Sequence, residues 1–244
     1  MAAEVTRLQS AFQARIARRR DLLTTRVLAA PAGDLDGWLA EVVPLVLDTQ
    51  RAVVADTDAF LALDAGLATG TDTRPWGLDA DRLVGRVARR GTFLEDVYAR
   101  TLLATAGTTR VRLERELATD VTLARREATW IHTAGDPRVV GHRRVLSPGG
   151  KNCALCVVAS TRTYRSSDLA PIHSHCGCTT QPVYGPATAP TVDRAFLDDL
   201  YARAGSNRYG DLRTLQVLDD ELPAGLAPAT VPRAVAVVDT AELG

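Results

Sequence analysis

The sequence predicts a mainly α-helical protein, in which an N-terminal helical bundle or set of extended helices is followed by a small α+β module and C-terminal helices. Two observations predict this order. Apolar residues recur at three- and four-residue steps through residues 3–134, which is the period of a helix face. Beyond Pro137 this period gives way to short valine-rich runs, turn residues and all four cysteines. We therefore expect four parts: a helical region (1–137), a Cys/His module (138–190), C-terminal helices (191–222) and a Pro-, Ala- and Val-rich tail (223–244).

The composition and the apolar runs limit the class of protein. Hydrophobic residues make up 46% of the chain and charged residues 24%, a balance that supports a folded core. No apolar run approaches the roughly 18 residues that a transmembrane helix needs, so we expect no membrane-spanning segment. The N-terminus lacks the apolar stretch of a signal peptide, so we expect synthesis in a reducing cytoplasm, where thiols persist.

The first predicted helix covers residues 3–29 and would be about 40 Å long at about 1.5 Å per residue. Such a length suits a bundle or an extended arm. Residues 31–33 end this helix, and Asp34 can cap a second helix that runs to residue 63 or 66, with Pro44 expected to kink or break it. The apolar face of the second helix comprises Trp38, Leu39, Val42, Val43, Val46, Val53, Phe60 and Leu61.

Two further helical segments complete the helical region. The third is expected from near Asp79 to just before Gly107, with a break at Gly91, and the fourth from residue 108 or 109 to Ala134. We interpret His132, in the last turn, as a favourable charge at a helix C-terminus rather than as a ligand. The predicted buried stripe of the fourth helix is Val111, Leu117, Val121, Ala124, Ala128 and Ile131.

Charge alternates in blocks, although the net charge is zero. Residues 1–30 carry six arginines against two acids, residues 34–81 carry ten acids against two arginines, and residues 82–148 carry thirteen arginines against seven acids. We interpret the alternation as helices that neutralise one another in a bundle. The run Arg18–Arg20 is interpreted as a solvated helix face, with a contact to DNA or to an acidic partner as the alternative.

A dense group of soft metal ligands follows the helical region. All four cysteines and two of the four histidines lie in the order Cys153-x-x-Cys156, then His173, His175, Cys176 and Cys178. A structural zinc site takes four thiolate or imidazole ligands in a tetrahedron, and the spacing of Cys153 and Cys156 lets one turn supply two of them. His173 and Cys176, and likewise His175 and Cys178, repeat that spacing. The sequence therefore predicts a structural zinc with one fixed pair and two candidate second pairs.

Other uses of the cysteines are weighed against zinc. Two disulfides are possible, but they would leave the histidines without a role and they favour an oxidising compartment. A thioredoxin-type redox site would leave the second cluster unexplained. A catalytic zinc usually has a carboxylate nearby, and Asp168 is the one acid between Gly149 and Pro190. A structural zinc is thus the preferred interpretation.

The secondary structure around these ligands is expected to be short and mixed. Short strands are predicted at residues 139–140, 145–146 and 161–164, with a turn at 147–150 and a helical turn at 157–160. Such a module buries little apolar surface alone, so a metal would supply stability that the core lacks. Helices are predicted at residues 193–204 and 211–221, and a strand or edge-adding peptide at residues 234–238.

One stretch resembles a known family. The run from Arg143 to Cys156, R-R-V-L-S-P-G-G-K-N-C-A-L-C, together with P-I-H-S-H-C-G-C at residues 171–178, resembles the Mu F-like minor head proteins of tailed bacteriophages. The match covers residues 139–185, and the region before it is similar to the family only in being helical. Carried across, the family's histidine falls on His173 and its paired cysteines on Cys176 and Cys178. We therefore expect Cys153, Cys156 and His173 as ligands, Cys176 or Cys178 as the fourth, and His175 as the alternative histidine. The C-terminal residues are similar to the tails of family members from actinobacterial phages.

The resemblance implies a structural virion protein with no catalytic residue, hence not an enzyme. It implies a few copies inside the procapsid, made in the host cytoplasm and associated with the portal protein and with other head proteins such as capsid and scaffold. The implied role is head assembly and the packaging or delivery of DNA. Two alternatives stay open: a capsid-maturation protease or other phage-encoded enzyme, and a zinc-containing DNA-binding protein. The chain lacks a Gly-rich phosphate loop, a Gly-x-Ser-x-Gly elbow and a His-Glu-x-x-His motif.

Overall fold

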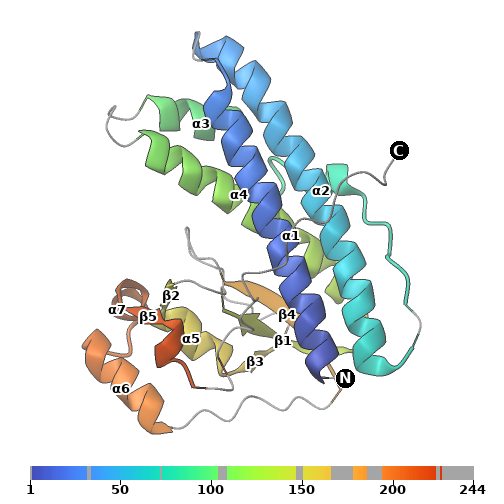
Figure 1. Cartoon of the computed structure of the whole chain (residues 1–244), viewed down its shortest axis with the longest axis vertical. Helices are drawn as coiled ribbons and strands as arrows, with labels where there is room; N and C mark the ends of the chain where they lie inside the picture. The colour runs from blue at the N-terminus through green and yellow to red at the C-terminus, as the bar shows by residue number, and fades with distance from the viewer. Residues whose placement is uncertain are drawn as a thin grey trace.

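The structure is a computed structural model that describes residues 2–31, 34–71, 73–103, 109–146, 151–165, 178–185 and 194–223, together with Leu226. Two thirds of these residues are helical, and they form seven α-helices and a small region of β-sheet. The long helices α1 and α2 run along most of the height of the molecule, and the strands lie with α5, α6 and α7 at the lower left, close to the N-terminal end of α1 (Figure 1). The expectation of a mainly α-helical protein is confirmed at this level.

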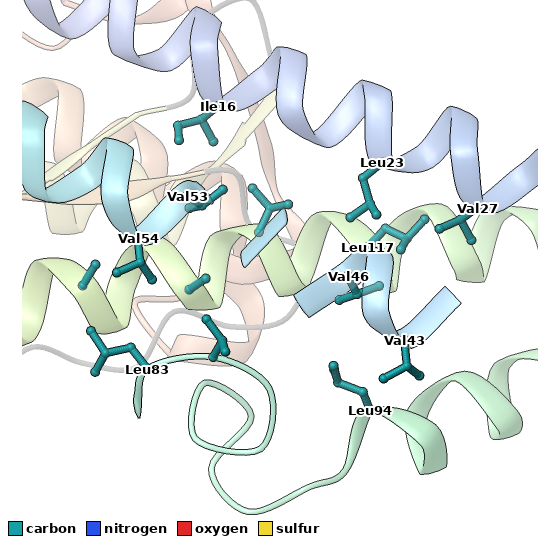
Figure 2. Close-up of a cluster of buried hydrophobic side chains, with 14 of the residues drawn as sticks. Ile16, Leu23, Val27, Val43, Val46, Val53, Val54, Leu83, Leu94 and Leu117 are labelled. Atoms are coloured by element: carbon teal, nitrogen blue, oxygen red, sulfur yellow. The ribbon is translucent and has the colours of Figure 1, made fainter. Parts of the chain in front are cut away.

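Three long helices form the bundle: α1 (Ala2–Ala29), α2 (Leu35–Thr69) and α4 (Thr109–Ala134). The shorter α3 (Leu94–Leu102) packs at the far end from the strands (Figure 1). Side chains from all four helices meet in one hydrophobic core, in which Leu23 of α1, Val46 of α2 and Leu117 of α4 are almost fully buried (Figure 2). The other labelled members of this core are Ile16, Val27, Val43, Val53, Val54, Leu83 and Leu94.

The ends of α2 follow from local chemistry. The Asp34 carboxylate accepts a hydrogen bond from the backbone N–H of Gly37 at 2.7 Å, as the predicted cap requires. Gly70 ends the helix in the left-handed conformation, at φ 69°, which glycine adopts without strain. Of the kink or break expected at Pro44, the break is wrong, because α2 continues through this residue. Proline removes one backbone hydrogen bond, but the buried side chains of Val42, Val43 and Val46 hold this part of the helix in the core.

The segment before α3 is not the helix that the sequence predicts. It has one 3-10 turn, η1 (Ala80–Arg82), followed by further turns. Gly85, Arg90 and Gly91 have φ angles of 60°, 51° and 98°, which an α-helix cannot contain. The backbone N–H of Gly85 donates to the side-chain oxygen of Gln50 on α2 at 2.7 Å, so a tertiary contact replaces a helical hydrogen bond.

The buried face of α4 differs in part from the predicted stripe. Leu117, Val121, Ala124 and Ala128 are buried as predicted, whereas Val111 is 49% exposed and Ile131 is 42% exposed. At 3.6 residues per turn, Val111 lies well off the line through Leu117, and Leu113 takes the buried position instead. In the last turn the buried positions pass to His132 and Thr133.

The C-terminal part contains two small antiparallel sheets. In the first, β1 (Val139–Val145) lies between β3 (Thr163–Tyr164) and β4 (Thr179–Tyr184). In the second, β2 (Lys151–Cys153) pairs with β5 (Gln216–Leu218). The two short strands predicted at 139–140 and 145–146 are thus one strand, because the basic residues between them also pair with β4.

Helices and a second core complete this part. α5 (Ala154–Ser160) follows β2, and α6 (Arg194–Ala204) agrees with its prediction. The single helix expected at 211–221 is wrong: α7 (Tyr209–Thr214) is followed by β5 and the 3-10 turn η4 (Asp219–Glu221). The predicted strand at 234–238 lies outside the described residues. The second core joins the Cys/His module to the C-terminal helices and comprises Leu146, Cys153, Ala154, Cys156, Val157, Cys178, Leu200, Leu212, Val217, Leu222 and Leu226.

Polar contacts join the bundle to the first sheet. The side-chain N–H of Gln181 on β4 donates to the Asp64 carboxylate of α2 at 3.1 Å, and Gln13 of α1 donates to the Thr179 hydroxyl at 3.4 Å. Within the bundle, Arg15 of α1 pairs with Asp56 of α2 at 2.9 Å, as expected from the alternating charge blocks. Within the described residues, no helix is both long and apolar enough to cross a bilayer.

Candidate metal centre

Three of the predicted ligands come together in the second core. Cys153 ends β2, Cys156 lies in α5, and Cys178 directly precedes β4. The Sγ atoms of Cys153 and Cys156 are 3.3 Å apart, and those of Cys156 and Cys178 are 3.2 Å apart. All three side chains are at most 4% exposed. Residues 22 positions apart in the chain thus place their sulfurs side by side.

Local structure explains the geometry of the first pair. Cys153 is the N-cap residue of α5 and has extended backbone angles, so Cys156 follows it at the first turn of the helix. The backbone N–H of Ala154 donates to the carbonyl of Leu215 at 2.9 Å, and Cys153 pairs with Gln216 of β5. The strand pairing with β5 therefore fixes the turn that presents both thiols.

The sulfur distances bear on the disulfide alternative for the three described cysteines. A disulfide bond is about 2.05 Å long, so neither sulfur pair is bonded in this way. Two thiolates on one tetrahedral zinc, with Zn–S bonds of about 2.3 Å, would be about 3.8 Å apart. A shift of about 0.5 Å in each pair would reach that spacing. The thiols are soft donors, and these two separations are compatible with a shared zinc ion.

The donor set of the described residues is incomplete. His173, His175 and Cys176 lie outside the described residues, so the fourth ligand and the choice between the two histidines stay predictions. Among the residues that the structure describes, no group of three or more His, Cys, Asp or Glu side chains qualifies by itself as a metal site. Zinc at this position therefore remains an expectation from the sequence, and the two sulfur contacts are compatible with it.

Arg144 of β1 reaches the sulfur cluster from the sheet side. Its Nη1 atom donates to the Sγ of Cys178 at 3.3 Å, and its side chain is buried. Burial opposes the charged form of Arg144, but the Cys178 thiol, its hydrogen bond and the Cys156 thiol act the other way, so the pKa of Arg144 is raised overall. The sequence analysis did not single out Arg144. Its contact with Cys178 depends on the alternation and register of β1, which no residue pattern in the sequence reveals.

A second buried polar cluster joins α4, α2 and the segment that follows α2. The Nδ1 atom of His132 lies 2.8 Å from the Asp58 carboxylate, and the Trp76 ring stacks on the imidazole with a centroid distance of 4.7 Å. Asp58 also accepts backbone hydrogen bonds from Trp76, Gly77 and Leu78. His132 lies in the last turn of α4, as predicted, and is 1% exposed, so it is held inside the protein by Asp58 and Trp76. The cluster holds the segment after α2 against the bundle. Asp58, Trp76 and His132 are far apart in the sequence, so their contact could not be predicted from it.

A third cluster lies deeper in the bundle. The buried Asp120 carboxylate accepts hydrogen bonds from the Tyr98 hydroxyl, from Arg89 Nε at 2.7 Å and from Gln50 Nε2 at 3.3 Å. Arg89 also pairs with Glu116 at 2.9 Å. None of the buried side-chain N and O atoms of this cluster lacks a partner, so the cluster fixes the packing of α2, α3 and α4 rather than presenting a reactive group.

Comparisons with protein-family models, with curated proteins and with solved structures find no match to this chain.

Proposed function

We propose that this chain is a minor head protein of a tailed bacteriophage, of the Mu F-like type. One observation carries the proposal: the order Cys-x-x-Cys, then Pro-x-His-x-x-Cys-x-Cys, after a long helical region. The proposed role is structural, as a portal-associated component of the capsid interior that acts in head assembly and in packaging or delivery of DNA. The proximity of Cys153, Cys156 and Cys178 in one core supports the proposal, because the pattern requires these residues to act together.

The proposed cofactor is one structural zinc, held by Cys153, Cys156 and His173 with Cys176 or Cys178 as the fourth ligand. Zinc supplies folding free energy to a module with a small core. Other parts of the chain position the ligands and shield them from water. Pairing of β2 with β5 positions the first two thiols, and the second core excludes water from the sulfurs.

The helical region is the proposed partner-binding part. Its core is complete within residues 12–128, so its outer faces do not depend on the C-terminal part for their shape. Exposed apolar side chains occur along it, including Leu22 at 54% and Leu103 at 76%. Such residues are ordinary on any surface, so the partner is inferred from the family pattern and not from a patch.

A pull-down with the portal protein encoded by the same phage tests the proposal. We expect the full-length chain to retain the portal protein from a co-expression lysate and to be found in purified proheads. The matched control is the same bait with the phage's tail-tube protein, which should not be retained. Absence of the chain from both proheads and virions would refute the assignment, whatever its metal content.

The DNA-binding alternative is tested by the salt dependence of binding to duplex DNA, which would be steep for a protein that contacts several phosphates. The arginine run that suggested it is partly engaged within the protein: Arg19 pairs with Asp56, and Arg20 pairs with Asp21 at 2.8 Å. The protease alternative predicts cleavage of a capsid or scaffold protein that is lost on replacing one serine. Either result would replace the structural role by the corresponding activity.

A further inference from the structure

Two buried histidines lie where the end of α4 meets its neighbours. His132 of α4 is 1% exposed, and His142 of β1 is fully buried. The Nδ1 atom of His132 lies 2.8 Å from the Asp58 carboxylate. The Nε2 atom of His142 lies 2.8 Å from the hydroxyl of Thr133, which is also on α4. Within the described part of the chain, the second nitrogen of each ring is buried without a hydrogen-bond partner. The two imidazoles therefore differ in whether a carboxylate lies beside them.

The contact with Thr133 determines which nitrogen of His142 carries the proton. A threonine hydroxyl has one hydrogen, and that of Thr133 donates to the carbonyl of Thr129 at 2.7 Å. The Thr133 oxygen therefore accepts from Nε2 of His142, which leaves Nδ1 unprotonated. A second proton would place a positive charge and a new N–H at Nδ1, where the described residues offer no acceptor. Burial of an unpaired charge and an unsatisfied donor is strongly unfavourable, so His142 is neutral in this packing.

The described elements that pack against β1 supply no counter-charge for a protonated His142. Their titratable side chains are Tyr164 on β3, Tyr184 on β4, Cys156 on α5 and His132 on α4, and Arg144 lies two residues further along β1. Burial raises the pKa of both tyrosines, so they are uncharged, and a cation at Arg144 cannot compensate another. The carboxylates around the end of α4 are engaged elsewhere, Asp136 with Arg138 and Asp58 with His132. Burial accordingly lowers the pKa of His142.

His132 provides the contrast within the same region. A second proton on this ring would lie beside a carboxylate, since Asp58 is 2.8 Å from Nδ1. The backbone N–H groups of Trp76 and Gly77 donate to the same carboxylate and hold it in place. A charge on His132 thus has a fixed partner, whereas a charge on His142 has only a hydroxyl. Of the two buried histidines, His142 is the one whose protonation opposes the packed structure.

We propose that His142 is an acid-sensitive latch: its neutral ring holds β1 against the end of α4 through Thr133, and its protonation opens this contact. The sign follows from linkage. A histidine with a lowered pKa in the closed state takes up a proton more readily once the contact opens, so closure is favoured above about pH 6.5 and weakens as the pH falls below it. Because β1 lies between β3 and β4, opening loosens the first sheet from the bundle. The latch depends neither on zinc nor on the virion role.

Hydrogen–deuterium exchange of the full-length protein at pH 7.5 and pH 5.5, corrected for the intrinsic effect of pH on exchange, tests the latch. We expect the open population reported by peptides from residues 139–145 to be about tenfold larger at pH 5.5, the effect of one histidine that is neutral when closed and titrates near pH 6.5 when open. His142→Gln keeps an N–H donor for Thr133 but does not titrate, so its ratio between the two pH values should stay within about threefold.

His132→Gln is the matched control, because it replaces the other buried histidine of the same region and should keep the tenfold ratio. Each protein is compared with itself at two pH values, so a variant of lower stability is still informative. Acid effects on the cysteines are common to all three proteins and cancel in the comparison. Equal ratios in the wild type and His142→Gln would overturn the latch, as would a ratio lost in His132→Gln and kept in His142→Gln. A wild type with the same open population at both pH values would overturn it without any variant.

Discussion

Replacement of Asp120 by alanine is the sharpest test of how the bundle is held together. The carboxylate is fully buried and accepts from Arg89, Tyr98 and Gln50, three side chains on three different segments. Breaking a buried ion pair costs about 3–5 kcal/mol, and leaving a buried hydroxyl without an acceptor costs about 1–3 kcal/mol. Because Glu116 still compensates Arg89, we expect a combined loss near the lower end, about 4 kcal/mol.

Urea denaturation followed by circular dichroism measures this loss. With a slope of about 2 kcal/mol/M, a loss of about 4 kcal/mol lowers the midpoint by about 2 M, which is a large part of the stability of an ordinary domain. The matched control is Glu114→Ala on the same helix, whose exposed pair with Arg110 should contribute less than about 1 kcal/mol. If the two variants unfold within about 1 kcal/mol of each other, the Asp120 cluster is not what joins these helices.

Three further predictions concern the metal, the bundle and pH. Purified protein should carry about one zinc per chain, and Cys153→Ala should lose the metal and be severely destabilised; metal analysis showing none, with all four thiols paired, would contradict this. A fragment of residues 1–134 should keep a strong helical spectrum in the presence of a chelator, because its core lies wholly within it, and a random-coil spectrum would refute the two-part organisation. Burial raises the pKa of Asp64 in the folded protein, and the hydrogen bond from Gln181 partly offsets this rise. Asp64 therefore contributes stability below about pH 4, and this contribution is lost as the pH rises through the raised pKa of the folded state. Asp64→Asn should therefore make the free energy of unfolding less dependent on pH above about 4 than it is in the wild type.

The long helices were predictable because their signals are local and repeated. Apolar residues at every third or fourth position over many turns are typical of an α-helix that buries one face. The N-terminal cap at Asp34 involves only the nearby backbone N–H of Gly37. Their limits in the structure differ from the prediction by a few residues. The continuity of α2 through Pro44 was not predictable in this way, since it depends on what packs against the helix around it.

Shorter segments were mispredicted where a tertiary contact outweighs local preference. The turns before α3 exist because Gly85 bonds Gln50 on another helix, a contact that no local pattern reveals. The single strand β1 contains His142, Arg143 and Arg144, which its pairing with β4 stabilises despite their polarity. In both cases the partner lies more than thirty residues away in the sequence.

For the candidate site, the ligand types and their spacing can be read from the sequence, whereas the residues that surround the ligands depend on the fold. The spacing of Cys153 and Cys156 predicts a shared ligand because two residues between them allow one turn to present both sulfurs. Cys178 was one of two candidates for the fourth ligand, with Cys176 as the other, and its approach to that pair depends on the first sheet and the second core. The contact of Arg144 with Cys178 had no sequence signal of its own, because β1 presents it through strand alternation and register.

The sequence by itself determined which residues repeat at helical period, where the second helix begins, and which side chains can bind a soft metal, because each of these depends on residue type and spacing alone. Only the tertiary structure decided that His132 is buried against Asp58, that Asp120 joins three segments, and that Arg144 of β1 donates to the Cys178 sulfur. The physical reason is that buried polar groups must find partners wherever the chain brings them, and those partners are set by packing between distant segments rather than by the residues next to them.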